Sequence, residues 1–270
     1  MSDNWKKTTR ILAAFSLLAA IIACGGSDDD DGAGDNTTAT GTADTTGTAA
    51  AQPAGGPPAA LELGAAPVSL NVPLPPSFNL TIATAGEYQI DATGASMDPE
   101  IFLYQGDQLV ENNDDGGERL NSQIVRFLAP GTYSVRVVEH RARAFTAQVQ
   151  AQQLQPLTPV GAVVPGEPLQ VQFPDFPILQ RPRNYRAAAR AVTFTVAAAG
   201  QYTCNASATN RRDPKMSIIQ NGIVLEEDDD SGDGNDAQIV RQFAAGTYTI
   251  RVWDWLKRGD TTITVTCNQG

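Results

Sequence analysis

Histidine and cysteine are scarce in this chain of 270 residues, which holds one His and three Cys. Transition-metal sites and many nucleophile–base pairs draw on these two residue types. The sole histidine, His140, has no cysteine near it in the sequence. No Gly-x-Ser-x-Gly, His-Glu-x-x-His or glycine-rich phosphate-binding motif occurs either. The sequence therefore predicts a protein that is not an enzyme.

The longest apolar run near the N-terminus is too short to cross a bilayer as a helix. It extends from Ile11 to Ala23, thirteen residues, whereas a membrane-spanning helix needs ~20. A short stretch with two lysines and an arginine precedes it, and this order is typical of a signal peptide. We therefore predict that residues 1–23 are a leader that directs export.

The leader ends in Ile21-Ile22-Ala23-Cys24-Gly25, which resembles a bacterial lipobox. The resemblance implies that the Cys24 thiol receives a diacylglyceryl group and becomes the mature N-terminus. Two or more acyl chains anchor a protein stably, so the membrane is an expected partner through the lipid. The acidic run Asp28 to Asp31 resembles sorting signals for the outer membrane or cell surface of the bacterial envelope. The alternative is a secretory leader that is cleaved elsewhere, with an incidental Cys24.

Large apolar residues are almost missing from the segment that follows the leader. Residues 24–60 consist mainly of Asp, Thr, Gly, Ala and Pro. Such a segment cannot bury enough surface to offset the entropy lost on ordering. We predict a disordered linker that separates the lipid from the folded part by roughly 30–35 Å.

The remainder of the chain contains an internal repeat. Three pairs of segments recur at one offset of 115 residues: Asp98-Pro99 and Asp213-Pro214, Gln123-Ile124-Val125-Arg126 and Gln238-Ile239-Val240-Arg241, and Gly131-Thr132-Tyr133 and Gly246-Thr247-Tyr248. A constant offset over this length indicates a duplicated structural unit. We place the first repeat at residues 61–155 and the second at 156–270, and the second carries a basic insertion at 175–190.

Both repeats consist of short runs rich in Val, Ile, Thr, Tyr and Phe, separated by Gly, Asp, Asn and Pro. This pattern predicts many short antiparallel strands, and no ten-residue window has helical periodicity. Asn221-Gly222 lies between two apolar runs and favours a tight hairpin turn. Gln105-Gly106-Asp107 has the same role in the first repeat. The predicted class is all-β.

An acidic loop precedes a Gly-Thr-Tyr-x-[Val/Ile]-Arg-Val strand in each repeat. The loops are Asn113-Asp114-Asp115-Gly116-Gly117 and Asp228-Asp229-Asp230-Ser231-Gly232. This arrangement resembles the bacterial pre-peptidase C-terminal domain family over about 80 residues of each repeat. The resemblance implies two tandem jelly-roll-like antiparallel β-sandwiches. Members lie beside secreted peptidases or repeat in surface proteins, and some bind collagen and calcium. Because no peptidase domain is present in this sequence, the resemblance implies an accessory role.

Basic residues are fewer than acidic ones, and the net charge is -11. An acidic protein repels phosphate backbones, so nucleic acid is not an expected partner. The charge is unevenly distributed, because residues 61–155 hold 11 acidic and 5 basic residues whereas residues 156–270 hold 12 and 11. Charge alone therefore permits the two repeats to contact one another.

The two cysteines beyond the lipobox, Cys204 and Cys267, lie in strand-like segments of the second repeat. Their counterparts in the first repeat are Ile90 and Ala151, which indicates that the two cysteines were acquired as a pair. A disulfide between them fits an oxidising compartment. Two buried free thiols are the alternative.

The acidic loops are the first candidate site, with Ca²⁺ as the expected cofactor. Calcium takes six to eight oxygen ligands, and Asp229, Ser231 and Asp233 have the opening spacing of a calcium loop. The twelfth position is Val240 rather than Glu, which excludes an EF-hand. The other candidate ligands are Asp228, Asp230 and Asp236 in this loop and Asp114, Asp115 and Glu118 in the first repeat. The alternative, which the sequence favours, is a solvated turn between strands.

The second candidate site is a binding surface around the last hairpin. If Val252 faces the core, Arg251, Trp253 and Trp255 point outward, and neighbouring exposed indoles suit sugar rings or an apolar edge of a partner. The alternative is that a loop or the other repeat covers the rings. The basic insertion can be that loop, or it can dock an anionic glycan, a lipid headgroup or the acidic first repeat. Its candidate contact residues are Arg183, Tyr185 and Arg186.

These observations predict a lipid-anchored, extracytoplasmic binding module that recognises an extracellular polysaccharide or protein polymer, or another envelope protein. The alternative is a structural spacer, or a subunit of an envelope assembly, without a ligand of its own. Indoles that are exposed in the isolated protein, together with affinity for a polysaccharide or peptide polymer, favour the first function. Oligomerisation or a stable envelope partner favours the second.

Overall fold

The computed structural model describes residues 59–72, 77–94, 97–141, 143–176, 182–209 and 211–270. The predicted leader, Cys24 and nearly all of the predicted linker lie outside the described residues. Most of the described residues belong to β-strands, and one four-residue helix is present among them. The all-β prediction is therefore confirmed.

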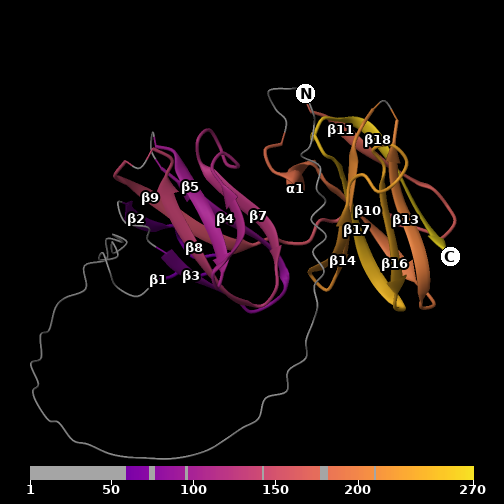
Figure 1. Cartoon of the computed structure of the whole chain (residues 1–270), viewed down its shortest axis with the longest axis horizontal. Coiled ribbons are helices and arrows are strands. Elements are labelled where there is room, and N and C mark those ends of the chain that lie inside the picture. The colour runs from indigo at the N-terminus through magenta and orange to yellow at the C-terminus, as the bar shows by residue number, and fades with distance from the viewer. Residues whose placement is uncertain (1–58, 73–76, 95–96, 142, 177–181, 210) are drawn as a thin grey trace, which may run out of the picture. The chain divides into compact units, whose positions relative to one another are not determined.

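The first repeat forms a sandwich of two sheets (Figure 1). One sheet has the strand order β1-β3-β8-β5-β6, and the other has the order β2-β9-β4-β7. The strands are β1 (Ala59–Ala60), β2 (Val68–Val72), β3 (Ser77–Ile82), β4 (Gly86–Thr93), β5 (Pro99–Gln105), β6 (Gln108–Asn113), β7 (Ser122–Leu128), β8 (Gly131–Glu139) and β9 (Phe145–Gln153).

The second repeat has the same two orders, β10-β12-β17-β14-β15 and β11-β18-β13-β16. Its elements are β10 (Pro159–Val163), β11 (Leu169–Asp175), α1 (Tyr185–Ala188), β12 (Arg190–Val196), β13 (Gly200–Ala208), β14 (Pro214–Gln220), β15 (Ile223–Asp228), β16 (Ala237–Phe243), β17 (Gly246–Asp254) and β18 (Gly259–Gln269). Helix α1 lies in the basic insertion, between β11 and β12.

Not every strand pair is antiparallel, although the sequence predicts that they are. Strand β1 pairs with β3 in parallel, and β10 pairs with β12 in parallel. Parallel neighbours need a crossover connection. The chain provides one here, because β2 and β11 belong to the opposite sheets and separate the two members of each parallel pair.

Alternating side chains build the inner faces of the sandwiches. In β17, Tyr248, Ile250 and Val252 are buried, as expected for one face of a strand. The hairpin between β14 and β15 turns at Asn221 and Gly222, with φ of 51° and 75°. Positive φ at both central positions is the requirement of a type I′ turn, so the predicted hairpin is confirmed.

Each sandwich contains two tyrosines whose hydroxyl groups return to the backbone four residues earlier. A buried phenol needs such a partner, and this arrangement fixes the path of the chain at the entry to a strand. The hydrogen bonds run from Tyr88 to the carbonyl of Thr84, from Tyr133 to Ala129, from Tyr202 to Ala198, and from Tyr248 to Ala244.

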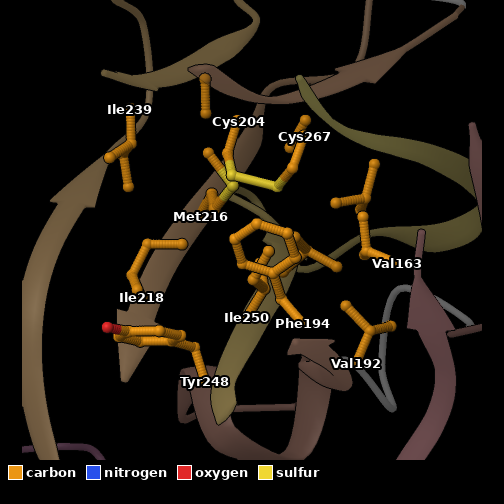
Figure 2. Close-up of a cluster of buried hydrophobic side chains, with 14 of the residues drawn as sticks. Val163, Val192, Phe194, Cys204, Met216, Ile218, Ile239, Tyr248, Ile250 and Cys267 are labelled. Atoms are coloured by element: carbon orange, nitrogen blue, oxygen red, sulfur yellow. A yellow bond between two sulfur atoms is a disulfide. The ribbon is translucent and has the colours of Figure 1, made fainter. Parts of the chain in front are cut away.

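A disulfide lies in the core of the second repeat (Figure 2). It joins Cys204 of β13 to Cys267 of β18, which are direct partners across the two strands. In the first repeat, Ile90 and Ala151 are paired in the same way. The predicted disulfide and the predicted equivalence are confirmed. Beside it lie rings that pack edge to face, among them Phe194, with Tyr202 and Phe243.

Candidate functional site

The acidic loop of the second repeat is held by its own first carboxylate. Asp228 ends β15, and its two oxygens accept hydrogen bonds from the Ser231 amide, the Ser231 hydroxyl and the Gln238 amide, at 3.1, 2.5 and 2.8 Å. At the other end of the loop, Asp236 accepts a hydrogen bond from the Ala208 amide at 3.2 Å. These two carboxylates therefore stabilise the loop.

Asparagines make the same contacts in the first repeat. Asn113, the counterpart of Asp228, accepts hydrogen bonds from the amides of Gly116 and Gln123. Asn121, the counterpart of Asp236, accepts one from Gly94. Because a neutral amide performs the same task, the charge of these positions is not needed for the loop conformation.

The other candidate ligands in the second-repeat loop are mostly exposed to solvent. Asp230, Ser231 and Asp233 are exposed, and Asp229 is partly buried. Burial raises the pKa of Asp229, and the neighbouring Asp230 adds to this effect. Within the part of the chain that the structure describes, no three His, Cys, Asp or Glu side chains form a group that could hold a metal ion. Calcium binding by this loop stays a prediction.

A shallow polar hollow of about 400 Å³ adjoins the same loop. Strands β13 and β16 contribute lining residues, and the Gln238 side chain donates a hydrogen bond to Asn205 at 2.9 Å. Its lining residues are Asn205, Ser207, Ser231, Gly232, Asp233, Asp236 and Gln238. The hollow therefore offers hydroxyl, amide and carboxylate groups to a polar ligand.

The acidic loop of the first repeat contacts the basic insertion. Asp114, Asp115 and Glu118 have exposed side chains. The Arg183 guanidinium donates hydrogen bonds to the main-chain oxygens of Asp115 and Arg119, at 2.9 and 2.6 Å. The loop therefore presents its backbone to the second repeat and its carboxylates to solvent.

The two tryptophans of the predicted platform differ in exposure. Trp253, on β17, is 4% exposed, whereas Trp255, in the following turn, is 50% exposed. The Tyr185 ring of α1 covers Trp253 with ring centroids 5.5 Å apart. The expectation of a platform made of two exposed indoles is therefore wrong for Trp253, and the insertion is the loop that covers it.

Arg251, also expected on the free surface, is buried as well. It is 3% exposed, and its guanidinium lies 4.7 Å from the centre of the Phe127 ring and 5.7 Å from that of Tyr185. Such placement over ring faces is a cation–π contact. Phe127 belongs to the first repeat, so the two repeats meet at this arginine.

Glu87 is the acidic partner of Arg251. It is 3% exposed, and it accepts two parallel hydrogen bonds from Arg251 at 2.7 and 2.9 Å. Arg186 of the insertion also pairs with Glu87, and the Tyr185 hydroxyl lies 3.3 Å from it. Two cations and a hydroxyl thus surround one buried carboxylate. We name Glu87, Arg186, Arg251, Tyr185 and Phe127 the inter-repeat clasp.

The environment of the clasp explains why charges can be buried in it. A bidentate contact between arginine and carboxylate is among the stronger hydrogen-bonded pairs, and a buried pair needs this geometry to offset desolvation. Burial also raises the pKa of Tyr185, with the Glu87 charge as the second cause. Tyr185 therefore stays protonated and able to donate. Among the described residues, Arg251 Nε is the one buried side-chain nitrogen or oxygen without a hydrogen-bond partner.

Two further contacts surround the clasp. The Asn184 side chain, which also caps α1, donates a hydrogen bond to the Gln123 side chain at 2.7 Å. The hairpin turn of the second repeat lies against the first repeat, because a Cβ added to Gly222 would be 2.4 Å from the Ala85 carbonyl oxygen. Polar, aromatic and main-chain groups thus all contribute to the contact.

Sequence reasoning did not identify Glu87 as a site residue. Its counterpart in the second repeat is Gln201, which is exposed. A charged residue at a position where the other repeat is neutral was the available signal. The same comparison does not identify Arg251, because its counterpart is also an arginine, Arg136, and that residue is exposed.

A second carboxylate motif occurs at the end of β8 and β17. Glu139 accepts hydrogen bonds from Arg143 and from the amides of residues 141 and 143. Asp254 accepts equivalent bonds from Arg258. The Arg143 hydrogen bond lowers the pKa of Glu139 to about 2. For Asp254, burial raises the pKa, but the hydrogen bonds from Arg258 outweigh it and the pKa is lowered.

Neither the family comparison nor the comparison with curated proteins gives a match to this sequence. Among the described residues, no helix has the length and apolar character that crossing a membrane would require.

Several solved structures are similar to the chain. A pre-peptidase C-terminal domain of a Bacillus anthracis collagenase is 12% identical, with a TM-score of 0.33, and the match covers 43% of this chain and 100% of that domain. The CUB1-EGF-CUB2 region of human MASP-1/3 is 10% identical, with a TM-score of 0.24, over 74% of this chain and 93% of that region. A secreted protein from Eubacterium rectale is 7% identical, with a TM-score of 0.22, over 71% and 67%. At these values the likenesses carry no functional argument, and the family membership of this chain stays a prediction.

Proposed function

We propose that the chain is a lipid-anchored, extracytoplasmic structural module without enzymatic activity, acting as a spacer or as a subunit of an envelope assembly. The inter-repeat clasp carries this proposal. The residues expected to form a free binding surface, Arg251, Trp253 and Tyr185, instead pack against one another and against Phe127 of the first repeat. Because these arginine and aromatic side chains form a contact between the two repeats, they would hold the repeats in a fixed orientation.

The location outside the cytoplasm is supported by two independent features. The leader and Cys24 predict export and lipidation. The disulfide between Cys204 and Cys267 is of the kind that persists in oxidising compartments. The anchor is tested by replacing Cys24 with alanine, after which the protein should no longer fractionate with membranes through a lipid.

Amide hydrogen exchange on the full mature chain tests the clasp. Glu87→Gln installs the residue that the second repeat has at this position, and it leaves the arginines without their buried anion. Losing one partner of a buried pair costs about 3–5 kcal/mol. We expect the segments 182–190 and 85–88 to exchange at least about tenfold faster in this variant, while the core of the second repeat keeps its protection.

Glu226→Gln is the matched control, because it removes a half-exposed ion pair with Arg241 within one repeat. This control should leave exchange of the insertion unchanged. Equal protection of residues 182–190 in wild type and Glu87→Gln would rule out the clasp.

The structural role is tested in the native host, where Glu87→Gln at normal protein level should reproduce the envelope defect of a deletion strain.

The polar hollow favours a second candidate function, which is binding of an extracellular polymer. The amide, hydroxyl and carboxylate groups that line the hollow suit hydroxyl-rich ligands. Affinity electrophoresis in gels that contain polysaccharide tests it, with Ser207→Trp to fill the hollow. Retardation of the wild type that Ser207→Trp abolishes would support binding at the hollow, and equal mobility of both would count against it.

A further inference from the structure

The turn between β17 and β18 presents two apolar side chains to solvent. The Lys257 amide donates a hydrogen bond to the Asp254 carbonyl at 2.7 Å, which closes a four-residue turn. Trp255 and Leu256 occupy its two central positions and are 50% and 53% exposed. Below them, the Trp255 amide is bound to the Asp213 carbonyl at 2.7 Å. The backbone of the turn is thus held in place, and its two largest apolar groups point away from the core.

Basic residues surround this turn, although the chain as a whole is acidic. The turn region 254–260 and the neighbouring loop 209–215 hold five basic and three acidic residues, against a net charge of -11 for the chain. Arg212 and Arg258 pair with Asp254. Lys215 pairs with Glu227, which lies outside these two segments, so the local basic excess is small. The two segments are in contact, because the Arg258 and Arg212 side chains bond to main-chain oxygens of the opposite segment. The Lys215 ammonium lies 4.8 Å from the centre of the Trp255 ring.

The equivalent turn in the first repeat has the same backbone hydrogen bond but different side chains. The His140 amide is bound to the Asp98 carbonyl at 2.8 Å, as Trp255 is to Asp213. The residues His140 and Arg141 stand where the second repeat has Trp255 and Leu256, and both are exposed. The apolar pair is therefore not required by the turn itself.

We propose that the Trp255–Leu256 turn is a membrane-contact tip that inserts into the headgroup region of an anionic lipid bilayer. Tryptophan prefers the boundary between headgroups and acyl chains, and leucine beside it adds apolar area. Lysine and arginine around such a tip are attracted to anionic lipids. This combination fits a lipid surface better than a sugar, because a sugar platform needs a flat ring face with polar neighbours, whereas Leu256 extends the apolar surface.

Contact quenching of tryptophan by brominated acyl chains tests this tip in the mature full-length chain, incorporated into vesicles. Trp253 is covered, so Trp255 is the tryptophan that lipid can reach. In vesicles with anionic lipid we expect quenching that is absent in purely neutral vesicles. Leu256→Arg, which installs the first-repeat residue, should remove most of it. Arg211→Gln should weaken partition of the tip about fivefold. Leu120→Arg is the matched control, because Leu120 is 49% exposed elsewhere in the chain.

The outcomes separate this inference from the proposed function. Co-sedimentation with neutral vesicles reports the lipid anchor alone, and a chain without the lipid stays in the supernatant. The chain without the lipid still tests the tip, because the tip alone should make it co-sediment with anionic vesicles. Quenching that is equal in neutral and anionic vesicles, or unchanged by Leu256→Arg, would overturn the tip. A Trp255 emission shift with a soluble polyanion but not with vesicles would also overturn it, because the partner would then be a polymer.

Discussion

The disulfide in the second repeat replaces an apolar pair of the first. Cys204 and Cys267 stand where Ile90 and Ala151 are paired across the same two strands. We expect the double variant Cys204→Ile, Cys267→Ala to fold, because the first repeat already accommodates this pair. The crosslink spans 63 residues, for which the chain-entropy treatment gives a loss of about 4 kcal/mol. Urea unfolding of wild type and variant measures the loss.

The reduced wild type is the control for this prediction. It lacks the crosslink but keeps both sulfur atoms, so a difference between it and the double variant reports packing. A double variant as stable as the oxidised wild type would show that the disulfide does not contribute to stability through the unfolded chain.

Glu139 should make stability depend on pH at the acid end. Its pKa is lowered from an ordinary 4.5 to about 2, chiefly by the Arg143 hydrogen bond. A carboxyl whose pKa is lower in the folded state stabilises fully above its unfolded pKa, and this contribution is lost as pH falls from about 4.5 toward 2. Urea midpoints across this range should therefore fall less steeply in Glu139→Gln than in wild type. Arg143→Gln should flatten the curve in the same way, and curves parallel to the wild type would contradict the assignment.

Single positions differ in how far the sequence predicts them. The cysteine pair follows from the equivalence of the repeats, because Cys204 and Cys267 correspond to Ile90 and Ala151, which are paired across the same two strands. Glu139 lies four positions before its arginine, Arg143, so this pair is local in the sequence. Glu87 could not be predicted, since its role depends on an arginine brought to it by folding. For Glu87 that arginine, Arg251, is 164 positions away in the chain.

The acidic loop is the element in which a structural and a metal-binding function are separable. Asp228 and Asp236 already accept loop hydrogen bonds, which leaves Asp229, Asp230 and Asp233 for a cation. If calcium binds, a concentration of 100 times its dissociation constant stabilises the fold by ~2.7 kcal/mol. The thermal midpoint in millimolar calcium should then exceed that in chelator by several degrees.

Two variants assign such a shift to this loop. Asp229→Ala, Asp233→Ala should abolish it, whereas Asp228→Asn should retain the loop, because Asn113 supports the first-repeat loop in the same way. Equal midpoints with calcium and with chelator in the wild type would show that the loop is a solvated turn.

The elements themselves were largely predictable, and their neighbours less so. Alternation of apolar residues predicts β17, and Asn221-Gly222 predicts the hairpin between β14 and β15, because both patterns are local. The parallel pairing of β1 with β3 was not predicted, since it depends on β2 crossing to the other sheet. The insertion was recognised by its length and charge, but its short helix has no apolar periodicity that would indicate it.

The contact between the repeats combines features that the sequence presents separately. The excess of acid in the first repeat and the basic insertion in the second permit a contact, but they equally permit binding of an anionic ligand. Burial decides between these hypotheses. Trp253 and Arg251 are covered, so the charge asymmetry is used within the chain, and Trp255 remains the exposed indole of the pair.

Two glycines in equivalent hairpins provide a test of this contact that does not alter a charge. Gly106 and Gly222 both have positive φ, at 58° and 75°. Alanine is strained at either position by about 1–2 kcal/mol. A Cβ at Gly106 meets no atom within 4 Å, whereas one at Gly222 would be 2.4 Å from the Ala85 carbonyl oxygen in the first repeat. Only Gly222→Ala must therefore displace the contact.

We expect Gly106→Ala to lower stability by the strain alone and to keep the insertion protected from hydrogen exchange. Gly222→Ala should cost more and should also release the segment 182–190, because the hairpin can no longer lie against Ala85. Calorimetry gives the two stabilities and exchange mass spectrometry gives the protection. If both variants lose the same stability and keep the same protection, the repeats do not rest on this hairpin in solution, and the spacer proposal loses its structural basis.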